Sequence, residues 1–255
     1  MNAADIIRIK DLLPTAMGSD ELREQVAADI LRRSVFSARM ESARYLARIR
    51  EACAQMMEGR MSQATARDIL GGILERMGLS PQDGGGISNP ASLARLNLII
   101  ETQTQMAASV ARLSEQTPAV LDMWPAWELV RLEDRDMKRS DWPQRWDAAA
   151  RAVGFEGVSR DYGRMVALKD SPVWQALGDG AGGFRDTLGN PFPPFAFNSG
   201  MGWVDVTREE CEELGLDPDG ASAPAAASLA PDREELARAA EKWGFDYDEI
   251  AKGVA

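Results

Sequence analysis

One stretch decides the fold of this chain: WPAWELVRL at residues 124–132. Residues 127–132 combine aromatic, aliphatic and charged side chains in a pattern typical of a strand. The alternation of apolar and polar residues slips between Leu129 and Val130, which indicates a bulge or burial on both faces. Because the residues before this stretch are expected to be helical, the sequence predicts an α+β fold.

The region before this strand, residues 1–116, is predicted to be mainly helical. Ser19 is a good N-cap, and the carboxylates at the next two positions complement the helix dipole. No proline interrupts residues 19–57, so we expect one long helix there, or two joined end to end. Four apolar residues of this stretch share a helical face: Leu46, Ile49, Cys53 and Met56. Cys53 is therefore expected to be a buried apolar residue and not a reactive thiol.

A second helix is expected from the N-cap Ser62 to a stop at Gly78 and Pro81. It carries apolar residues on one side, namely Ile69, Ile73 and Met77, with Leu70 and Leu74 beside them. The residues that follow, 82–88, are rich in glycine and are expected to form a loop.

A third helix is expected to begin at Asn89, as N-cap, and Pro90. Its apolar stripe consists of Leu93, Leu96, Ile100, Ala107 and Val110. The polar run ETQTQ, residues 101–105, lies in its middle. This run is either a solvated face or a hydrogen-bonding surface that positions a partner or the neighbouring domain.

Residues 117–216 are predicted to form a mixed, tryptophan-rich α+β domain. Asp141 is expected to cap a helix whose inner side carries Trp142, Trp146, Ala150 and Val153. Residues 164–168 are a candidate strand, and one or two helical turns follow Pro172. Residues 178–203 are expected to form a long ordered coil, held by its aromatic side chains Phe184, Phe192, Phe195, Phe197 and Trp203.

The C-terminal part is expected to contain a linker and a helix. Residues 217–231 are rich in Ala, Ser, Pro, Gly and Asp, a composition that does not form a core. Residues 232–255 are predicted to form an acidic terminal helix with Leu236, Ala239, Ala240 and Trp243 on one side. Because such a stripe buries little area, a chain truncated after Leu216 is expected to stay folded.

The composition excludes several classes of function. Histidine is absent, which removes Ser-His-Asp and Cys-His nucleophile activation and histidine-ligated metal sites. No G-x-x-x-x-G-K-[ST] motif is present, which excludes an ATP-driven DNA-packaging motor. Cys53 and Cys211 lie far apart and suggest neither a disulfide framework nor a zinc site, as in a reducing cytoplasm. The sequence predicts no signal peptide and no transmembrane helix.

The net charge of −11 belongs to the second half of the chain. Up to Thr117 there are 14 basic and 14 acidic side chains, and the remainder carries 15 basic and 26 acidic ones. An acidic chain does not gain affinity for duplex DNA by releasing counterions. Proteins are therefore expected as partners, and not free DNA.

Two local patterns could carry chemistry, and both have an ordinary structural interpretation. GDGAGG, residues 178–183, matches G-x-G-x-x-G, but dinucleotide binding needs a strand before it and a helix after it, whereas here a short helix enters and a proline-rich coil leaves. Four glutamates surround Cys211, namely Glu209, Glu210, Glu212 and Glu213. We expect them on the solvated surface of a short helix, residues 206–214, and not in a metal or acid–base site.

The arginines of the predicted long helix form two groups. Arg32, Arg39 and Arg50 would share one face, and Arg44 and Arg48 form a second pair. They are either an ordinary solvated face, since acidic residues are interleaved with them, or a surface that faces an acidic partner or packaged DNA.

Five strings occur in a characteristic order between about residues 19 and 216. They are VFSAR at 35–39, LNLIIETQTQMA at 96–107, WPAWEL at 124–129, GRMVALKDSPVW at 163–174 and NPFPPFAFNSGMGW at 190–203. In these strings the chain resembles the minor head proteins related to the F protein of phage Mu, a head-morphogenesis family. The resemblance implies a helical N-terminal region, a mixed C-terminal domain that in some members is similar to ADP-ribosyltransferases, low copy number, and a place at the portal inside the shell.

The chain departs from the family pattern in two places. Many relatives carry an Arg-x-x-His segment after the mid-chain strand and a cysteine-containing string after the late prolines. This chain has RDMK at residues 135–138 and NSGM at residues 198–201 instead. The departures put a metal- or thiol-dependent role in doubt.

The resemblance implies a structural component for capsid assembly and DNA packaging, and not an enzyme. The expected partners are phage portal and capsid proteins, with indirect contact to packaged DNA left open; no membrane and no small-molecule substrate is expected. The expected location is the virion, in the head interior or at the portal, and the host cytoplasm during assembly. No catalytic, cofactor-binding or metal-binding residue is assigned, and no cofactor is expected.

The alternative is an ADP-ribosyltransferase-like enzyme or effector of phage origin. Arg131 would hold the dinucleotide, and Glu209 or Glu210 would support the transition state. Neither a Glu-x-Glu turn nor a Ser-Thr-Ser strand accompanies these residues, so the sequence favours the structural role.

Overall fold

The computed structural model has an α+β fold and describes residues 1–79, 89, 92–133, 139–155, 163–230, 232, 234, 237–238 and 241. Several predictions fall outside these residues: the loop at 82–88, the positions of Pro81 and Pro90, the RDMK segment, and most of the acidic terminal helix with Leu236 and Trp243.

The chain divides into two compact units. Unit 1 consists of Met1–Val110 and Ser228–Ala255, and unit 2 of Ala111–Ala227. The division between residues 110 and 111 falls inside a helix, so the boundary predicted at residue 116 stays a prediction.

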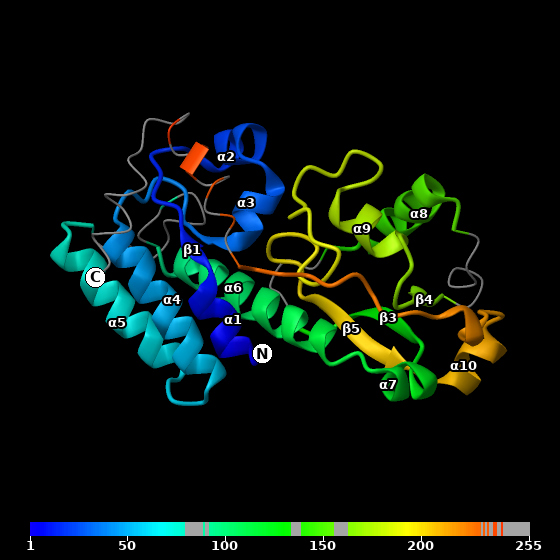
Figure 1. Ribbon diagram of the computed structural model, residues 1–255. Coiled ribbons are helices and arrows are strands. Elements are labelled where there is room, and N and C mark those ends of the chain that lie inside the picture. Colours follow the sequence, from blue (N-terminus) through cyan, green and yellow to red (C-terminus); the bar gives the residue numbers. More distant parts are fainter. Residues whose placement is uncertain are drawn as a thin grey trace. The chain divides into compact units, whose positions relative to one another are not determined.

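Unit 1 is mainly helical (Figure 1). Its helices are α1 (Ala3–Ile9), α2 (Ser19–Gln25), α3 (Ala28–Arg33), α4 (Ala43–Met57), α5 (Gln63–Arg76) and most of α6 (Leu93–Ser114). Two short strands, β1 (Asp11–Leu12) and β2 (Ser34–Val35), pair in parallel. Helix α4 packs against both α1 and α5, and its inner face is fully buried at Leu46, Ile49 and Cys53. The burial of Cys53 confirms the prediction.

The expectation of a continuous helical stretch over residues 19–57 is wrong. Helices α2, α3 and α4 are separate, and strand β2 lies between α3 and α4. The cause is a long-range pairing, because Ser34 and Val35 pair with β1, and the N–H of Leu13 donates to the carbonyl of Val35. Further along, Arg39 has a φ of 60°, which a right-handed helix cannot contain.

The starts of the helices agree only in part with the predictions. Ser62 caps α5, and Thr117 caps the helix α7 (Pro118–Met123); each side chain accepts a backbone N–H group of the first helical turn. The Ser62 cap confirms its prediction. Ser19 is the first helical residue of α2, and Gly18 occupies the cap position. Helix α6 begins at Leu93, where the hydroxyl of Ser92 accepts the N–H of Arg95, so the cap predicted at Asn89 is wrong.

The apolar stripes of α5 and α6 were predicted with errors. In α5 the buried residues are Ala66, Leu70, Gly71 and Leu74, whereas Ile69 and Met77 are exposed. In α6 the predicted stripe is buried except for its first member, Leu93. The stripe of α5 was misplaced because two apolar stripes lie side by side on this helix.

Unit 2 is built around a three-stranded antiparallel sheet in the order β4-β3-β5. Its strands are β3 (Ala126–Arg131), β4 (Val166–Leu168) and β5 (Met201–Val206). Its helical elements are the end of α6, α7 (Pro118–Met123), α8 (Trp142–Val153), α9 (Val173–Gly178), α10 (Arg208–Glu213) and the 3-10 helix η1 (Pro218–Gly220). The strands and helices predicted from residues 124–178 are present. The inner side predicted for α8 is only partly right, because its buried residues are Trp142, Arg145, Trp146 and Ala149, whereas Ala150 and Val153 are half-buried; Asp141 holds the cap position without a side-chain hydrogen bond.

Both faces of the sheet are buried near the start of β3. On one face Trp127 packs with Trp203 and Trp174, and on the other Ala126 belongs to a core with Val206 and Cys211. The β3–β5 register is continuous from Ala126↔Val206 to Arg131↔Met201. Leu129 is buried and Val130 is half-buried, so β3 is covered fully on one face and in part on the other at the broken alternation, and no bulge interrupts this pairing.

The predicted long coil is present between α9 and β5. Phe192 and Phe195 are fully buried in it, and the Phe195 ring lies 6.0 Å from the rings of both Trp174 and Trp203. The guanidinium of Arg145 lies 4.2 Å from the Phe184 ring centre and pairs with Asp186. The coil is therefore held by aromatic packing, as predicted, and also by ion pairs.

No helix among the described residues is both long and apolar enough to cross a membrane.

Candidate functional site

A polar site of unit 2 surrounds Asp205 on β5, and we call it the Asp205 cluster: Arg112, Gln116, Trp127, Lys169 and Asp205. Lys169 donates from Nζ to Gln116 Oε1 at 2.7 Å and lies 2.9 Å from Asp205 Oδ1. The indole N–H of Trp127 donates to the same Oδ1 at 3.0 Å. Arg112 donates to Asp205 Oδ2 and to the carbonyl of Trp203, both at 2.7 Å.

Aromatic packing places these polar groups. The ring of Trp127 stacks on that of Trp203 with centroids 3.8 Å apart and an interplanar angle of 9°. Lys169 Nζ lies 5.2 Å from the Trp127 centroid, within cation–π range. Because β3 and β5 pair Trp127 with Asp205, the indole and the carboxylate meet on the same face of the sheet.

The two central charges differ in burial. The Lys169 side chain is wholly buried, whereas the Asp205 side chain keeps 35% of its surface exposed. Burial lowers the pKa of Lys169 although the hydrogen bond with Asp205 opposes this. Burial alone would raise the pKa of Asp205, but the hydrogen bond from Lys169 and the charge of Arg112 outweigh it, so this pKa is lowered.

This geometry suits a structural link better than a reactive group. Nζ of Lys169 has two acceptors and no exposed surface, so it would have to leave both acceptors to reach a substrate. Asp205 accepts from three side chains. The cluster joins α6, β3, the β4–α9 turn and β5, four segments that are distant in sequence.

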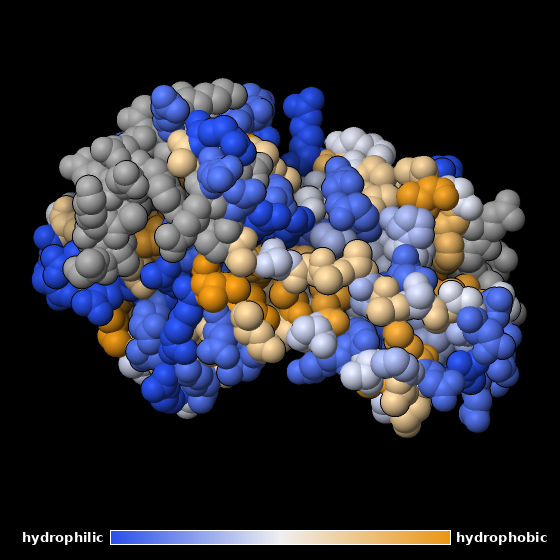
Figure 2. Space-filling model, viewed as in Figure 1, coloured by the Kyte–Doolittle hydropathy of each residue, from blue (hydrophilic) through white to orange (hydrophobic). Residues whose placement is uncertain are grey.

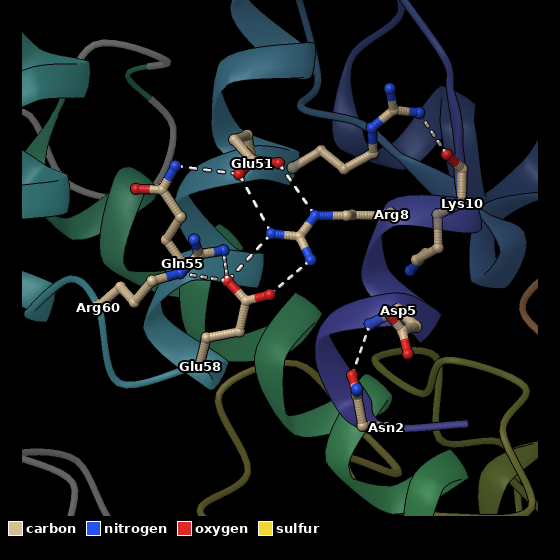
Figure 3. A network of polar contacts seen from close by, with 9 residues as sticks. Asn2, Asp5, Arg8, Lys10, Glu51, Gln55, Glu58 and Arg60 are labelled. Carbon is tan, nitrogen blue, oxygen red and sulfur yellow. Dashed lines mark hydrogen bonds and ion pairs between the residues drawn. The ribbon is translucent and has the colours of Figure 1, made fainter.

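Unit 1 contains a more exposed network, the Arg8 cluster: Arg8, Glu51, Gln55, Glu58 and Arg60 (Figure 3). Figure 3 shows the guanidinium of Arg8 between the carboxylates of Glu51 and Glu58, with distances of 3.2 Å and 2.6 Å. Hydrogen bonds from Arg8 and Arg60 lower the pKa of Glu58 to about 2. The cluster ties α1 to the end of α4.

A buried lysine lies beside this cluster. Lys10 is fully buried, and its Nζ donates to Gln103 Oε1 of α6 at 2.5 Å. Gln103 in turn donates to the carbonyl of Ser34. Burial lowers the pKa of Lys10 to about 7. Within the described part of the chain no carboxylate forms an ion pair with Lys10.

The polar run at residues 101–105 is therefore not simply a solvated face. Thr102 and Gln103 are buried, and Glu101 accepts a hydrogen bond from Gln63 of α5. The run forms hydrogen bonds within unit 1, and the interpretation that it positions a partner or the neighbouring domain stays a prediction.

The predicted shared face of Arg32, Arg39 and Arg50 is wrong, whereas the predicted pair of Arg44 and Arg48 is present on α4. Arg32 belongs to α3, Arg39 to the turn after β2 and Arg50 to α4, so the three do not share one helical face. Arg50 donates to the carbonyl of Lys10. Arg44 and Arg48 lie one turn apart on the exposed side of α4. In the described part of the chain neither of them forms an ion pair.

The glycine motif at residues 178–183 has a packing role. It follows helix α9 and leads into coil, as predicted. A Cβ at Gly178 would lie 1.8 Å from the carbonyl oxygen of Asn190, and one at Gly180 would lie 2.1 Å from that of Phe184. Gly180 and Gly182 also have positive φ. These glycines allow the backbone of the coil to approach closely.

The glutamates around Cys211 lie on α10, and the Cys211 side chain is buried in the same core as Ala126, on the face of the sheet opposite Trp127. Glu210 accepts the N–H of Thr207 in a capping box and pairs with Arg164, which also pairs with Glu128. Glu209, Glu212 and Glu213 are not buried, so the predicted surface role is confirmed for them. Among the described residues no group of three acidic or cysteine side chains could hold a metal ion.

The residues of the transferase alternative are not brought together. Arg131 pairs with Met201 at the start of β5, whereas Glu209 and Glu210 follow Val206 at its end. A six-residue strand spans about 17–20 Å. The guanidinium of Arg131 donates to the carbonyls of Ser199 and Arg139, so it stabilises the backbone of two connecting segments.

The pairings of Asp205 and the position of Lys10 were missed by sequence reasoning. The abundance of tryptophan was the only signal for the pairings of Asp205, and no local pattern indicated the position of Lys10.

Comparisons with family models, curated proteins and solved structures give no significant match to this chain.

Proposed function

We propose that this chain is a minor head protein of a tailed phage or prophage, a structural and portal-associated component in head assembly and DNA packaging. The observation that carries the proposal is the order of the five strings that resemble the Mu F-like family. These strings fall on β2 and the turn after it, the middle of α6, β3, β4 with the start of α9, and the coil with β5.

The strings also supply several of the buried polar and aromatic residues of both units, although Lys10 and Asp205 lie outside them. Gln103 belongs to the second string, Trp127 to the third, Lys169 to the fourth and Trp203 to the fifth. The resemblance therefore concerns residues that maintain the fold. This favours a structural protein, because an enzyme would be expected to resemble its family in exposed catalytic groups.

The proposed location is the phage head or portal, with the host cytoplasm as the place of assembly. The proposed partners are the portal and capsid proteins. Arg44 and Arg48 suit such a contact, since both are exposed and neither is paired within the described residues. A partner with acidic side chains would form ion pairs with these two arginines, and the phosphates of packaged DNA carry the same negative charge.

The direct test is a pull-down of the phage's own portal protein by the recombinant chain, with quantification of the chain in purified heads. We expect retention of the portal and few copies per head relative to the major capsid protein. Failure to bind the portal together with absence from heads would contradict the proposal. Calorimetric titration with NAD should be flat, and micromolar binding would favour the transferase instead.

A charge-reversal pair tests the arginines. Arg44→Glu with Arg48→Glu should weaken portal retention, because the repelled partner loses two contacts. Arg151→Glu with Arg185→Glu is the matched control, since these arginines of unit 2 are also exposed and change the net charge equally. Equal loss in both pairs would indicate a general effect of charge and not a contact at α4.

A further inference from the structure

Helix α5 exposes apolar side chains that the described part of unit 1 leaves uncovered. Ile69 is 46% exposed and Met77 42% exposed, and Ile73 between them is half-buried. The three recur at spacings of four residues, so they form one line along the helix, which we call the α5 stripe. Figure 2 shows apolar side chains at the surface where Figure 1 places α5, among mostly hydrophilic neighbours.

Two opposite charges flank the stripe at equal distances from Gly72. Asp68 precedes this glycine by four residues and Arg76 follows it by four, so each lies about 6 Å from the level of Gly72 along the helix axis. Both side chains are exposed, and neither forms an ion pair with a residue that the structure describes. The Arg76 guanidinium lies back over the glycine, with Nη1 3.7 Å from where a Cβ of Gly72 would be.

This order of charges makes α5 complementary to itself in an antiparallel pair. With a two-fold axis at Gly72, each residue lies level with the residue of the second copy that is equally far from Gly72 in the opposite direction. Asp68 is then level with Arg76 of the second copy, and the same pair forms the other way round. Two symmetric ion pairs therefore follow from one arrangement of charges.

The apolar residues match in the same arrangement. Along the helix axis Ile69 lies about 4.5 Å before Gly72, whereas Ile73 and Met77 lie about 1.5 Å and 7.5 Å after it. In the antiparallel pair Ile69 is therefore level with the midpoint between Ile73 and Met77 of the second copy. Its side chain can enter the gap between these two residues, as ridges enter grooves between packed helices.

The size of the surface sets the strength of the contact. Helix α5 has 14 residues and is about 21 Å long, so one of its faces buries less than the roughly 800 Å² per partner of a standard stable interface. Glu75 is also exposed and adds a second carboxylate on the side of Asp68, which opposes association. The lack of a side chain at Gly72 favours close approach of the two helices. A weak, reversible contact is therefore expected.

We propose that the chain forms a weak antiparallel dimer through α5, with the two-fold axis at Gly72, the two α5 stripes interlocked, and Asp68 of each copy paired with Arg76 of the other. A second copy suits this surface because the surface itself supplies both the opposite charge and the apolar spacing that each side needs. The inference does not depend on the proposed phage function.

Sedimentation velocity over a range of protein concentrations tests the dimer. We expect a reversible dimer with a Kd on the order of 100 micromolar. Arg76→Asp should raise this Kd about tenfold or more, because it replaces two attractions by two repulsions. Adding Asp68→Arg to Arg76→Asp restores opposite charges across the axis and should return the Kd to near the wild-type value. A general effect of charge or of folding would not produce this recovery.

Two pairs of variants separate the α5 surface from other exposed positions. Ile69→Glu should raise the Kd at least about tenfold, because a carboxylate then enters the apolar gap. Leu93→Glu is its control, since Leu93 of α6 is also apolar and similarly exposed, at 41%. Arg44→Asp is the control for Arg76→Asp, at an exposed arginine of α4. Neither control should change the Kd.

Single cysteines locate the axis, because Cys53 and Cys211 are buried. Gly72→Cys should form an intermolecular disulfide under mild oxidation, since this position faces its own copy. Thr65→Cys should not, because its two copies would lie about 21 Å apart along the axis. The proposal is overturned by a wild type that stays monomeric to about millimolar concentration. A dimer unchanged by Arg76→Asp, a double variant without recovery, or equal crosslinking at Thr65 and Gly72 would overturn it as well.

Discussion

Lys169 lies 2.9 Å from Asp205, and the lysine side chain is wholly buried while that of the aspartate is partly exposed. Removing one partner therefore differs from removing the other. Asp205→Ala leaves a buried ammonium with Gln116 as its remaining acceptor in the cluster and should cost about 3–5 kcal/mol of unfolding free energy. Lys169→Met should cost clearly less, because Asp205 keeps Arg112, Trp127 and contact with water.

Urea unfolding of the two variants measures this difference. The unfolding free energy of the double variant should lie closer to that of Lys169→Met than to that of Asp205→Ala, because the double variant leaves no uncompensated ammonium. The opposite order of the single variants would show that the carboxylate, and not the lysine, carries the cost of burial.

Lys10 should make the stability of unit 1 depend on pH. Its pKa is lowered from 10.5 to about 7, so the unfolded chain binds more protons between these values and stability rises with pH. The contribution is smallest below pH 7. Because burial raises the pKa of Cys53 to about 12, the thiol has the opposite effect above its ordinary value of 9.0. The clean window is therefore pH 7 to 9.

Lys10→Met should flatten this dependence. Thermal melts at several pH values in the window, for the wild type and the variant, give the difference attributable to Lys10. Lys10→Arg is a useful control, because it keeps a charge that does not titrate in this range. A wild-type slope that survives in Lys10→Met would assign the effect to another group.

Gly178 should not tolerate a side chain. The Cβ of Gly178→Ala would meet the carbonyl oxygen of Asn190 at 1.8 Å, and a backbone atom of the coil cannot move aside cheaply. We expect a loss of about 3 kcal/mol or more. Gly72→Ala is the matched control in α5, where the nearest atom is Arg76 Nη1 at 3.7 Å; it should stabilise by about 0.5–1 kcal/mol. Chemical denaturation followed by tryptophan fluorescence distinguishes the two.

Truncation after Leu216 should destabilise the fold more than the linker-like composition of residues 217–231 predicts. The removed residues include Pro218, which is buried, Ser222, which donates to Asp170, and Leu229, which is 1% exposed. Loss of Leu229 alone should cost about 1.5–3 kcal/mol. Truncation after Ala230 keeps all three and should melt closer to the full-length chain. Identical melts for the two truncated chains would show that these contacts contribute little.

Local patterns predicted the elements whose residues carry their own signal. The strand around Trp127, the cap at Ser62 and the helix after Pro172 follow from side-chain type and spacing, and the structure confirms them. Strand β2 could not be predicted in this way, because it forms only through pairing with Asp11 and Leu12. On α5, periodicity located two adjacent apolar stripes, but only the position of α4 decides which one is buried.

The polar sites were less predictable than the fold. The partners of Asp205 come from four segments, and no local pattern links Lys169 to Gln116 or Trp127. Gln103 looked like part of a solvated run because its partner, Lys10, lies almost at the other end of unit 1 in sequence. Charge and polarity in a sequence thus indicate that a group needs a partner, but not which one.

The pairing of β3 with β5 has a consequence for synthesis of the chain on the ribosome. The central strand β3 emerges early, but its longer neighbour, β5, follows only after the helices α8 and α9 and the long coil. Until then Trp127 and Leu129 lack the rings and backbone that cover them. Topologies with such distant contacts fold slowly and expose apolar strands meanwhile. Nascent unit 2 is therefore expected to expose the apolar side of β3 until β5 has been synthesised, whereas the helices α1, α4 and α5 of unit 1 can begin to pack earlier.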